Sequence, residues 1–331
     1  MNLLDRLKRT DPLIVLIILA VIIAIILPAR GAFADAFDVA TKIGIALLFF
    51  LYGARLSPRE ALEGVKAWKL HLVILCFTFV VFPIIGVALR PLTTFISHDL
   101  YMGILFLTLV PSTVQSSVAF TSIAKGNVAG SIVAASASNL AGVFLTPVLV
   151  LLLMTGGEGG IHIDATVFRD IALQLLLPFI LGQLSRRWVK DCAANKGTKI
   201  VDRGSIAMVV YAAFSKGMVE NIWSTTGVWE VLFLVVFSVV LVAFMLWLTR
   251  FVPQKMGFNR KDTIAIEFCG TKKSLASGLP MASVIFTGGG LGLLILPLMI
   301  FHQVQLMMCS WLAARYARDN TAEGGAEKAN A

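Results

Sequence analysis

One apolar segment, residues 262–285, carries nine residues that are charged, hydroxylated or disruptive to a helix. They are Glu267, Gly270, Thr271, Lys272, Lys273, Ser274, Ser277, Gly278 and Pro280. A charged side chain inside a membrane costs at least about 2.5 kcal/mol, so it is normally paired or faces a cavity. Three ionisable groups within seven positions therefore indicate a site for an ion or a charged molecule. The alternative is a solvated loop at the membrane surface, but apolar residues 264–266 and 284–286 on either side disfavour it.

A second segment, residues 100–124, begins apolar and then turns polar directly after Pro111. The polar residues are Ser112, Thr113, Gln115, Ser116, Ser117, Thr121 and Ser122. Proline removes a backbone donor and disrupts the preceding turn, and the freed carbonyls are tolerated only inside protein or beside a water-filled cavity. The hydroxyls and the amide could satisfy these carbonyls or coordinate an ion. Ordinary bonding of Ser and Thr to their own helix explains this segment equally well.

The composition places both segments in an integral membrane protein. Of 331 residues, 58% are hydrophobic and only 14% charged, with a mean hydropathy of +0.86, whereas ordinary soluble domains have about 25% charged residues. The net charge of +9 lies mostly in the connections between apolar segments, which argues against nucleic-acid binding. The four cysteines are too widely spaced for a metal site or a disulfide framework.

Ten apolar segments of about the length of a membrane span can be delimited. They cover residues 12–28, 39–56, 69–89, 100–124, 128–153, 167–184, 201–217, 229–250, 262–285 and 290–314. The first follows Arg6, Lys8 and Arg9 and could be read as a secretory signal peptide. It exceeds the usual apolar core of such a peptide, about 7–15 residues, so we assign it as a transmembrane helix.

The basic residues give the orientation of the ten spans. The side that holds the N-terminus carries 21 Lys and Arg residues, the opposite side carries five, and Lys272 and Lys273 lie within a span. Because basic residues favour the cytoplasmic side, we predict that both termini are cytoplasmic, in the plasma membrane or the bacterial inner membrane.

Ten spans divide into two sets of five around the glycine-rich residues 156–160. An odd number of spans per half gives the halves opposite orientations, as in transporters with inverted repeats. We therefore predict an all-α integral membrane fold in which residues 1–157 form the first repeat and residues 158–317 the second. The polar residues 318–331 are expected to be a disordered tail.

At the two unusual segments the sequence resembles the bile acid:sodium symporter superfamily, in its bile-acid-symporter-like branch. The resemblance rests on Pro111-Ser-Thr-Val-Gln-Ser-Ser117, Gly126-Asn127, Trp68-Lys-Leu-His71, Asp262-Thr-Ile-Ala-Ile266, Phe268-Cys-Gly-Thr-Lys-Lys-Ser-Leu275 and Gly278-Leu-Pro-Met281. It implies a core and a panel domain, with spans four and nine interrupted and crossing in the core. It also implies sodium-coupled uptake of an organic anion by alternating access.

The resemblance further implies a sodium ion as the coupling ion, with Ser117, Ser131 and Glu267 as its ligands. Val118 and Ala135 stand where the family has an asparagine and a threonine ligand. We extend the candidate ion- and substrate-binding set along both segments and onto the fifth span. The full set is Ser112, Thr113, Gln115, Ser116, Ser117, Ser131, Asn139, Glu267, Thr271, Lys272, Lys273 and Ser274.

The expected function is a sodium-coupled symporter of a small organic anion, with the lipid bilayer as its surroundings and no cofactor. Two alternatives stay open. Coupling could be to protons, with Glu267 and the lysines as titrating groups, or the chain could be a regulatory membrane protein that transports nothing. An enzyme is not expected, because no nucleophile motif or His/Cys/Asp constellation is found.

Overall fold

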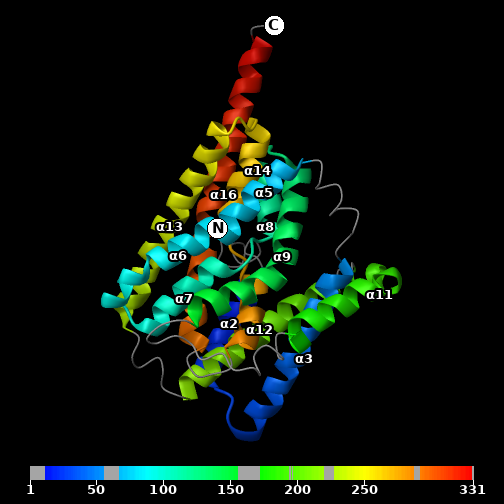
Figure 1. Cartoon of the computed structure of the whole chain (residues 1–331), viewed down its shortest axis with the longest axis vertical. Helices are drawn as coiled ribbons and strands as arrows, with labels where there is room; N and C mark the ends of the chain where they lie inside the picture. Colours follow the sequence, from blue (N-terminus) through cyan, green and yellow to red (C-terminus); the bar gives the residue numbers. More distant parts are fainter. Residues whose placement is uncertain are drawn as a thin grey trace, which may run out of the picture. The chain divides into compact units, whose positions relative to one another are not determined.

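The structure is a computed structural model that describes residues 12–55, 67–155, 172–193, 195, 197–219, 227–286 and 291–329. All regular elements in these ranges are helices, which confirms the predicted all-α class. Figure 1 labels most of them. In chain order they are α2 (Pro12–Ile26), α3 (Gly31–Arg55), α5 (Trp68–Cys76), the π-helix η2 (Phe77–Val81), α6 (Phe82–Ala88), the 3-10 helix η3 (Arg90–Thr94), α7 (His98–Leu109), α8 (Gln115–Ile123), α9 (Val128–Met154), the π-helix η4 (Ala172–Leu176), α11 (Leu177–Ala193), α12 (Thr198–Val219), α13 (Val228–Lys255), α14 (Arg260–Gly270), α15 (Leu275–Ile285) and α16 (Leu291–Ala329).

Four stretches of the described chain are long and apolar enough to cross a membrane. They are Trp68–Thr94, Val128–Met154, Val228–Lys255 and Leu291–Arg318. In α13 only 28% of the most apolar window is buried, so most of its large apolar side chains face outward, as lipid contact requires. The membrane class is thus confirmed, while the full count of ten spans and their inverted repeat stay predictions. Helix α16 runs on to Ala329, so helical backbone covers most of residues 318–331, where a disordered tail is expected.

The chain divides into two compact units. The first comprises residues 1–56, 151–227 and 276–296, and the second residues 57–150, 228–275 and 297–331. Each unit draws on both halves of the sequence, and the repeats 1–157 and 158–317 stay a prediction. The polar residues of interest fall in the second unit.

In the first unit, α3 packs closely along α11 through two glycines. A Cβ at Gly53 would collide with the carbonyl oxygen of Phe179, and a Cβ at Gly182 would collide with the carbonyl oxygen of Phe50. The two motifs, Phe-x-x-Gly in both helices, therefore face each other reciprocally. Small residues at such a contact allow the two backbones to approach, which is how helices associate closely in membranes.

Gly182→Ala is expected to destabilise this contact by about 1–3 kcal/mol, because the colliding atom belongs to a backbone that cannot rotate away. The matched control is Gly204→Ala on α12, where a Cβ meets nothing within 4 Å. That change should be neutral or stabilising by about 0.5–1 kcal/mol, as for glycine in a helix interior. Thermal unfolding of the purified variants measures both effects, and equal melting temperatures for the two would contradict the close contact.

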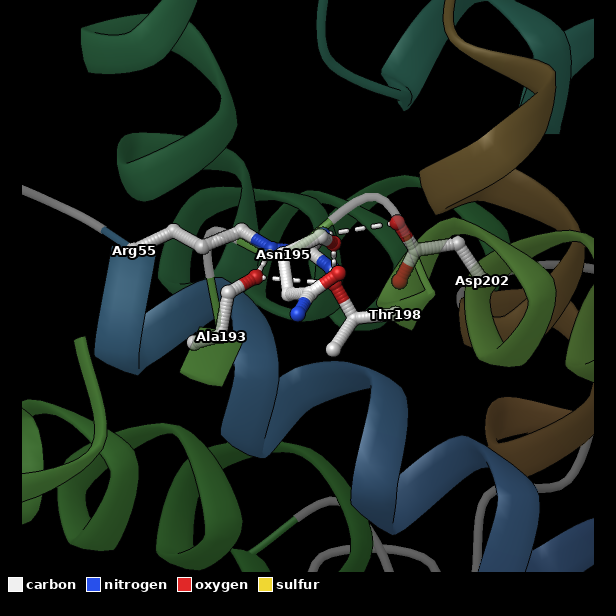
Figure 2. A network of polar contacts seen from close by, with 5 residues as sticks. All are labelled: Arg55, Ala193, Asn195, Thr198 and Asp202. Carbon is white, nitrogen blue, oxygen red and sulfur yellow. Dashed lines mark hydrogen bonds and ion pairs between the residues drawn. The ribbon is translucent and has the colours of Figure 1, made fainter. Parts of the chain in front are cut away.

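The C-terminal end of α3, which we predict to face the cytoplasm, is held in place by the side chain of Arg55 (Figure 2). Arg55 donates from Nε to the carbonyl oxygen of Ala193 at 2.8 Å, from Nη1 to Asp202 at 2.7 Å, and from Nη2 to the hydroxyl of Thr198 at 2.8 Å. Thr198 in turn donates to the carbonyl oxygens of Ala193 and Asn195. One planar side chain therefore joins the end of α3 to the end of α11 and the start of α12.

Arg55→Ala is expected to lower the stability of the protein by about 1.5–3 kcal/mol, because it removes the donor to the Asp202 carboxylate and one of the two donors to the Ala193 carbonyl. Arg55→Lys keeps the charge but loses the forked geometry, so it should recover only part of the loss. Melting temperatures of the two variants and the native chain test this order. A lysine variant as stable as the native chain would show that charge alone suffices.

In the second unit, the start of α14 is tied to the turn between α8 and α9. Asn259 caps α14 by accepting from the backbone N–H of Asp262 at 2.9 Å. Asn127 donates from its backbone to Lys261 at 2.9 Å and from its amide to Asp262 at 2.6 Å. A Cβ at Gly126 would come within 2.6 Å of Ile264. These contacts place α14 beside α8, and so bring the two polar segments together.

Candidate functional site

Both polar segments are broken helices, as predicted. Residues 110–114 separate α7 from α8, and residues 271–274 separate α14 from α15. We call these two non-helical stretches together the crossover. Helix ends leave backbone carbonyls and N–H groups without partners inside the helix. The partners of these groups determine what the crossover can bind.

The two breaks satisfy each other's backbone groups. The hydroxyl of Ser112 donates to the carbonyl oxygen of Cys269 at 2.6 Å, and that of Ser117 donates to Phe268 at 3.1 Å, both near the end of α14. In return, the backbone N–H of Ser274 donates to the carbonyl oxygen of Pro111 at 2.7 Å. Each broken helix therefore supplies the capping groups that the other lacks.

Helix α9 supports the first break from one side. The backbone N–H of Ser112 donates to the hydroxyl of Ser138 at 3.1 Å, and the amide of Asn139 donates to the Ser112 carbonyl at 2.7 Å. A Cβ at Gly142 would lie 2.7 Å from the ring of Pro111. Asn139, predicted as a binding residue, thus bonds directly to the break. Ser138 and Gly142 were missed because hydroxyls and small residues are common in membrane helices.

Helix α16 supports the second break through one amide side chain. Gln305 accepts from the backbone N–H of Lys273 at 2.9 Å and donates to the carbonyl oxygen of the same residue at 2.8 Å. It also pairs with His302 at 2.8 Å. Both backbone groups of Lys273 are therefore held although the helix is open there. The signal available in the sequence for Gln305 was a polar residue within an apolar span, and its hydrogen bonds join α16 to the break between α14 and α15.

The side chain of Lys273 is fully buried and fully bonded. Its ammonium donates to the carbonyl oxygens of Thr78, Thr108 and Val110 at 2.9, 2.8 and 2.9 Å. The same nitrogen lies 4.2 Å from the ring centroid of Phe82. Two of the carbonyls belong to the end of α7, where the helix dipole favours a cation. Lys273 therefore neutralises and caps a broken helix.

The neighbouring Lys272 is equally buried but has a different environment. Its ammonium lies 3.9 Å from the ring centroid of Phe120 and 5.6 Å from that of Phe268. Within the described part of the chain, this nitrogen has no hydrogen-bond partner. Aromatic faces attract a cation by about 2 kcal/mol when both are desolvated, yet three N–H donors remain unused. A buried ammonium with free donors is the group in the crossover best suited to bind an anion.

Glu267 is buried at 2% exposure near the end of α14. The hydroxyl of Tyr316 lies 2.9 and 3.2 Å from its two carboxylate oxygens, and Arg250 donates to the same hydroxyl at 2.9 Å. These three residues contribute to the wall of a cavity of about 610 Å³ in the second unit. The cavity is lined by Arg250, Gln254, Phe258, Arg260, Thr263, Ile264, Glu267 and Tyr316.

The remaining candidate residues lie along the same two segments. Thr113 pairs with the hydroxyls of Ser116 and Ser117 at 2.8 and 3.1 Å, and Thr271 pairs with Thr249 at 2.8 Å. Gln115 is exposed in the first turn of α8. The hydroxyls of the first break thus bond among themselves or to the facing break. Of the twelve candidate residues, Gln115 is the one that is exposed, whereas the others are buried or half-buried.

The three predicted sodium ligands, Ser117, Ser131 and Glu267, are all buried and hydrogen-bonded. Ser131 donates to the carbonyl oxygen of Val128 in its own helix at 2.9 Å. Ser117 donates toward α14, and Glu267 is bonded to Tyr316. Sodium coordination by these three side chains stays a prediction. The ammonium of Lys273 is a separate cation at the crossover, bound by three converging carbonyl oxygens.

Apolar spanning helices, two of them broken and joined at buried charges, define a polytopic membrane transporter. The chain belongs to the SBF-like CPA transporter family, which it matches over residues 11–318. The predicted resemblance to the bile acid:sodium symporter superfamily is thereby confirmed.

Three relatives illustrate the range of the family. An uncharacterized protein of Pseudomonas aeruginosa is 49% identical over 306 residues, with 91% of each chain covered. The "Putative symporter YfeH" of Escherichia coli is 46% identical over 314 residues, covering 93% of each chain. The sodium/bile acid cotransporter 7-B of Xenopus laevis is 32% identical over 322 residues, covering 94% of this chain and 93% of its own.

Proposed function

We propose that the protein is a secondary active transporter that carries a small organic anion across the membrane by alternating access. The observation that carries the proposal is the ammonium of Lys272 at the break between α14 and α15, which is fully buried and has no hydrogen-bond acceptor among the residues that the structure describes. Buried charges are normally paired, because an unpaired charge in a low-dielectric interior is strongly destabilising. The anionic group of a substrate supplies the missing acceptor.

The two breaks of the crossover are connected in a way that permits the movement that alternating access needs. The two breaks are joined by hydrogen bonds such as those of Ser112 and Ser274 rather than by continuous helix. Broken helices near the middle of the membrane, with helix ends directed at a charged ligand, are typical of secondary transporters. A rearrangement that exposes Lys272 to either side of the membrane delivers and releases the anion.

We propose sodium as the ion that drives uptake, and the names of the sodium/bile acid cotransporter relatives support this choice. Their names also suggest a bile acid as the first anion to test. The experiment is uptake into proteoliposomes of a panel that includes a conjugated bile acid, a dicarboxylate and an aryl sulfonate. Accumulation of one anion that requires an inward sodium gradient is the expected result. Accumulation that is indifferent to sodium contradicts sodium coupling.

Proton coupling is the second candidate, and one observation favours it. Glu267 carries a buried carboxylate at the wall of a cavity, so it could take up and release a proton without a sodium shell. An imposed pH gradient that drives accumulation in sodium-free buffer would select this mechanism. No accumulation of any anion under either gradient would instead favour the regulatory, non-transporting alternative.

We further propose that both termini face the cytoplasm, since the bias of 21 basic residues against five supports it. The experiment is labelling of single cysteines placed at Arg30 and at Asn259 in intact cells, using a reagent that does not cross the membrane. Labelling at Arg30 without labelling at Asn259 is expected. The reverse pattern would show that the chain has the opposite orientation.

A further inference from the structure

Lys273 occupies what is geometrically a cation site. Three backbone carbonyl oxygens, those of Thr78, Thr108 and Val110, converge on one nitrogen at 2.8–2.9 Å. We call these three oxygens the carbonyl cage. The ring of Phe82 closes it with its centroid 4.2 Å from the nitrogen. All four partners and Lys273 belong to the second unit, and the lysine is 0% exposed.

The sequence explains why the Thr78 carbonyl is free to join the cage. Residues 77–81 form the π-helix η2, and the N–H of Phe82 donates to the carbonyl oxygen of Phe77, five residues earlier. In π-helical register the partner of Thr78 would be residue 83, which is a proline without an N–H. The Thr78 carbonyl is therefore left without a backbone donor inside an apolar span. A short π-helix of this kind often marks a functional position.

The other two carbonyls are freed by the break after α7. The helical partner of the Thr108 carbonyl would be the N–H of Ser112, which instead donates to the hydroxyl of Ser138. Val110 has extended backbone, with ψ near 155°, so its carbonyl points away from any continuing helix. Two separate interruptions of helix geometry, in η2 and after α7, thus present oxygens to one point.

We propose that the ammonium of Lys273 is a tethered cation in this carbonyl cage, and that the cage binds a free monovalent cation once the lysine side chain is shortened. The charge that holds the crossover together is then part of the chain and never leaves it. An ion carried across the membrane binds elsewhere. Lys273 is a positioning residue, whereas Lys272 with its free donors contacts the anion. The inference goes beyond the proposed function and is tested without any transport assay.

The test is chemical rescue of the full-length protein in detergent. Lys273→Ala removes the equivalent of n-propylammonium and leaves the cage empty of its cation. The melting temperature is expected to fall by at least about 5 °C. Adding n-propylammonium chloride is expected to restore most of that loss, because a ligand of the folded state raises its apparent stability. Sodium chloride should restore less, because the carbonyls are spaced for N–H donors.

Three controls separate a cation site from a simple cavity. The uncharged isostere n-propanol should not restore Lys273→Ala, and n-propylammonium should not stabilise the native chain. Lys273→Met fills the space without a charge, so it should be destabilised and should not respond to n-propylammonium. Equal rescue by n-propanol and n-propylammonium, or a Lys273→Met variant as stable as the native chain, overturns the proposal.

If Lys273→Ala cannot be purified in ordinary buffer, expression and extraction are repeated with n-propylammonium chloride present. Recovery of a monodisperse protein only with the ammonium supports the cage as a cation site. Failure to recover any folded protein with n-propylammonium, when Lys273→Arg can be recovered, contradicts it. Neither outcome depends on which anion is transported, so failure of this inference is distinct from failure of the proposed function.

Discussion

Lys272→Met is expected to reduce anion transport by at least about 100-fold, which corresponds to about 2.7 kcal/mol of lost stabilisation. The ammonium of Lys272 donates to no group in the described ranges of the chain. Hydrogen bonds to charged groups in buried sites are the strong ones, and methionine removes the charge while filling nearly the same volume. The measurement is the initial rate of uptake of the anion selected by the proteoliposome panel.

The same substitution is expected to leave the melting temperature unchanged or to raise it. Removing an uncompensated buried charge relieves its desolvation cost, and hydrophobic replacements of buried charges often stabilise a protein by about 1–4 kcal/mol. Loss of transport with equal or greater stability is typical of a residue retained for function. Lys69→Met at the start of α5, where the lysine lies near Trp68, is the matched control and should retain transport. A Lys272→Met variant that transports normally would exclude the ammonium as the anion-binding group.

Glu267→Gln is expected to abolish accumulation against a gradient, with a loss of about 100-fold or more in net uptake. A buried carboxylate in a membrane is retained for an ion or proton pathway in most cases, and either coupling ion would need the charge that glutamine lacks. Anion exchange at equal concentrations, which requires no coupling ion, should be reduced less. Counterflow and gradient-driven uptake measured in parallel separate the two effects.

Tyr316→Phe provides a graded comparison for Glu267. It keeps the carboxylate but removes the hydroxyl that lies 2.9 Å from it, so it should lower gradient-driven uptake by about 10-fold, as the loss of a hydrogen bond that orients a functional group does. A Glu267→Gln variant that still accumulates the anion would show that the carboxylate only fills the interior. In that case Tyr316→Phe should also have no effect.

The crossover could be predicted from sequence because its chemistry is local. Pro111 followed by hydroxyls, and three charges around Gly270, are visible as departures from an apolar pattern. Charged and polar residues are costly inside a membrane, so their presence indicates positions that are retained for a function. The structure confirms that both segments are broken and joined at these residues.

The partners of the crossover could not be predicted in the same way. The oxygen that Thr78 supplies is a backbone carbonyl, and every residue has one, so no residue type marks it. Its availability depends on the π-helix and on Pro83 together. Lys272 and Lys273 also differ in hydrogen bonding, because adjacent side chains in a non-helical stretch reach different surroundings. Only the packing of α5–α8 around them decides which ammonium is bonded.

The predicted sodium ligands rest on the comparison of motifs alone. Ser117, Ser131 and Glu267 match a family pattern in type and order, yet their side chains bond to different partners. Val118 and Ala135, which stand at two further ligand positions of the family, supply no side-chain oxygen. The broken-helix architecture is therefore visible in the structure, whereas the sodium site stays a prediction from the resemblance.

We propose that the crossover binds an organic anion through Lys272. Thermal stabilisation of the purified protein by a panel of organic anions, cations and neutral compounds, with and without sodium, tests this binding. We predict that the stabilising compounds are anions, that stabilisation grows with their concentration as folded-state binding requires, and that it disappears in Lys272→Met but persists in Lys69→Met. Stabilisation by cations or neutral compounds alone, or by anions equally in Lys272→Met, would contradict the claim.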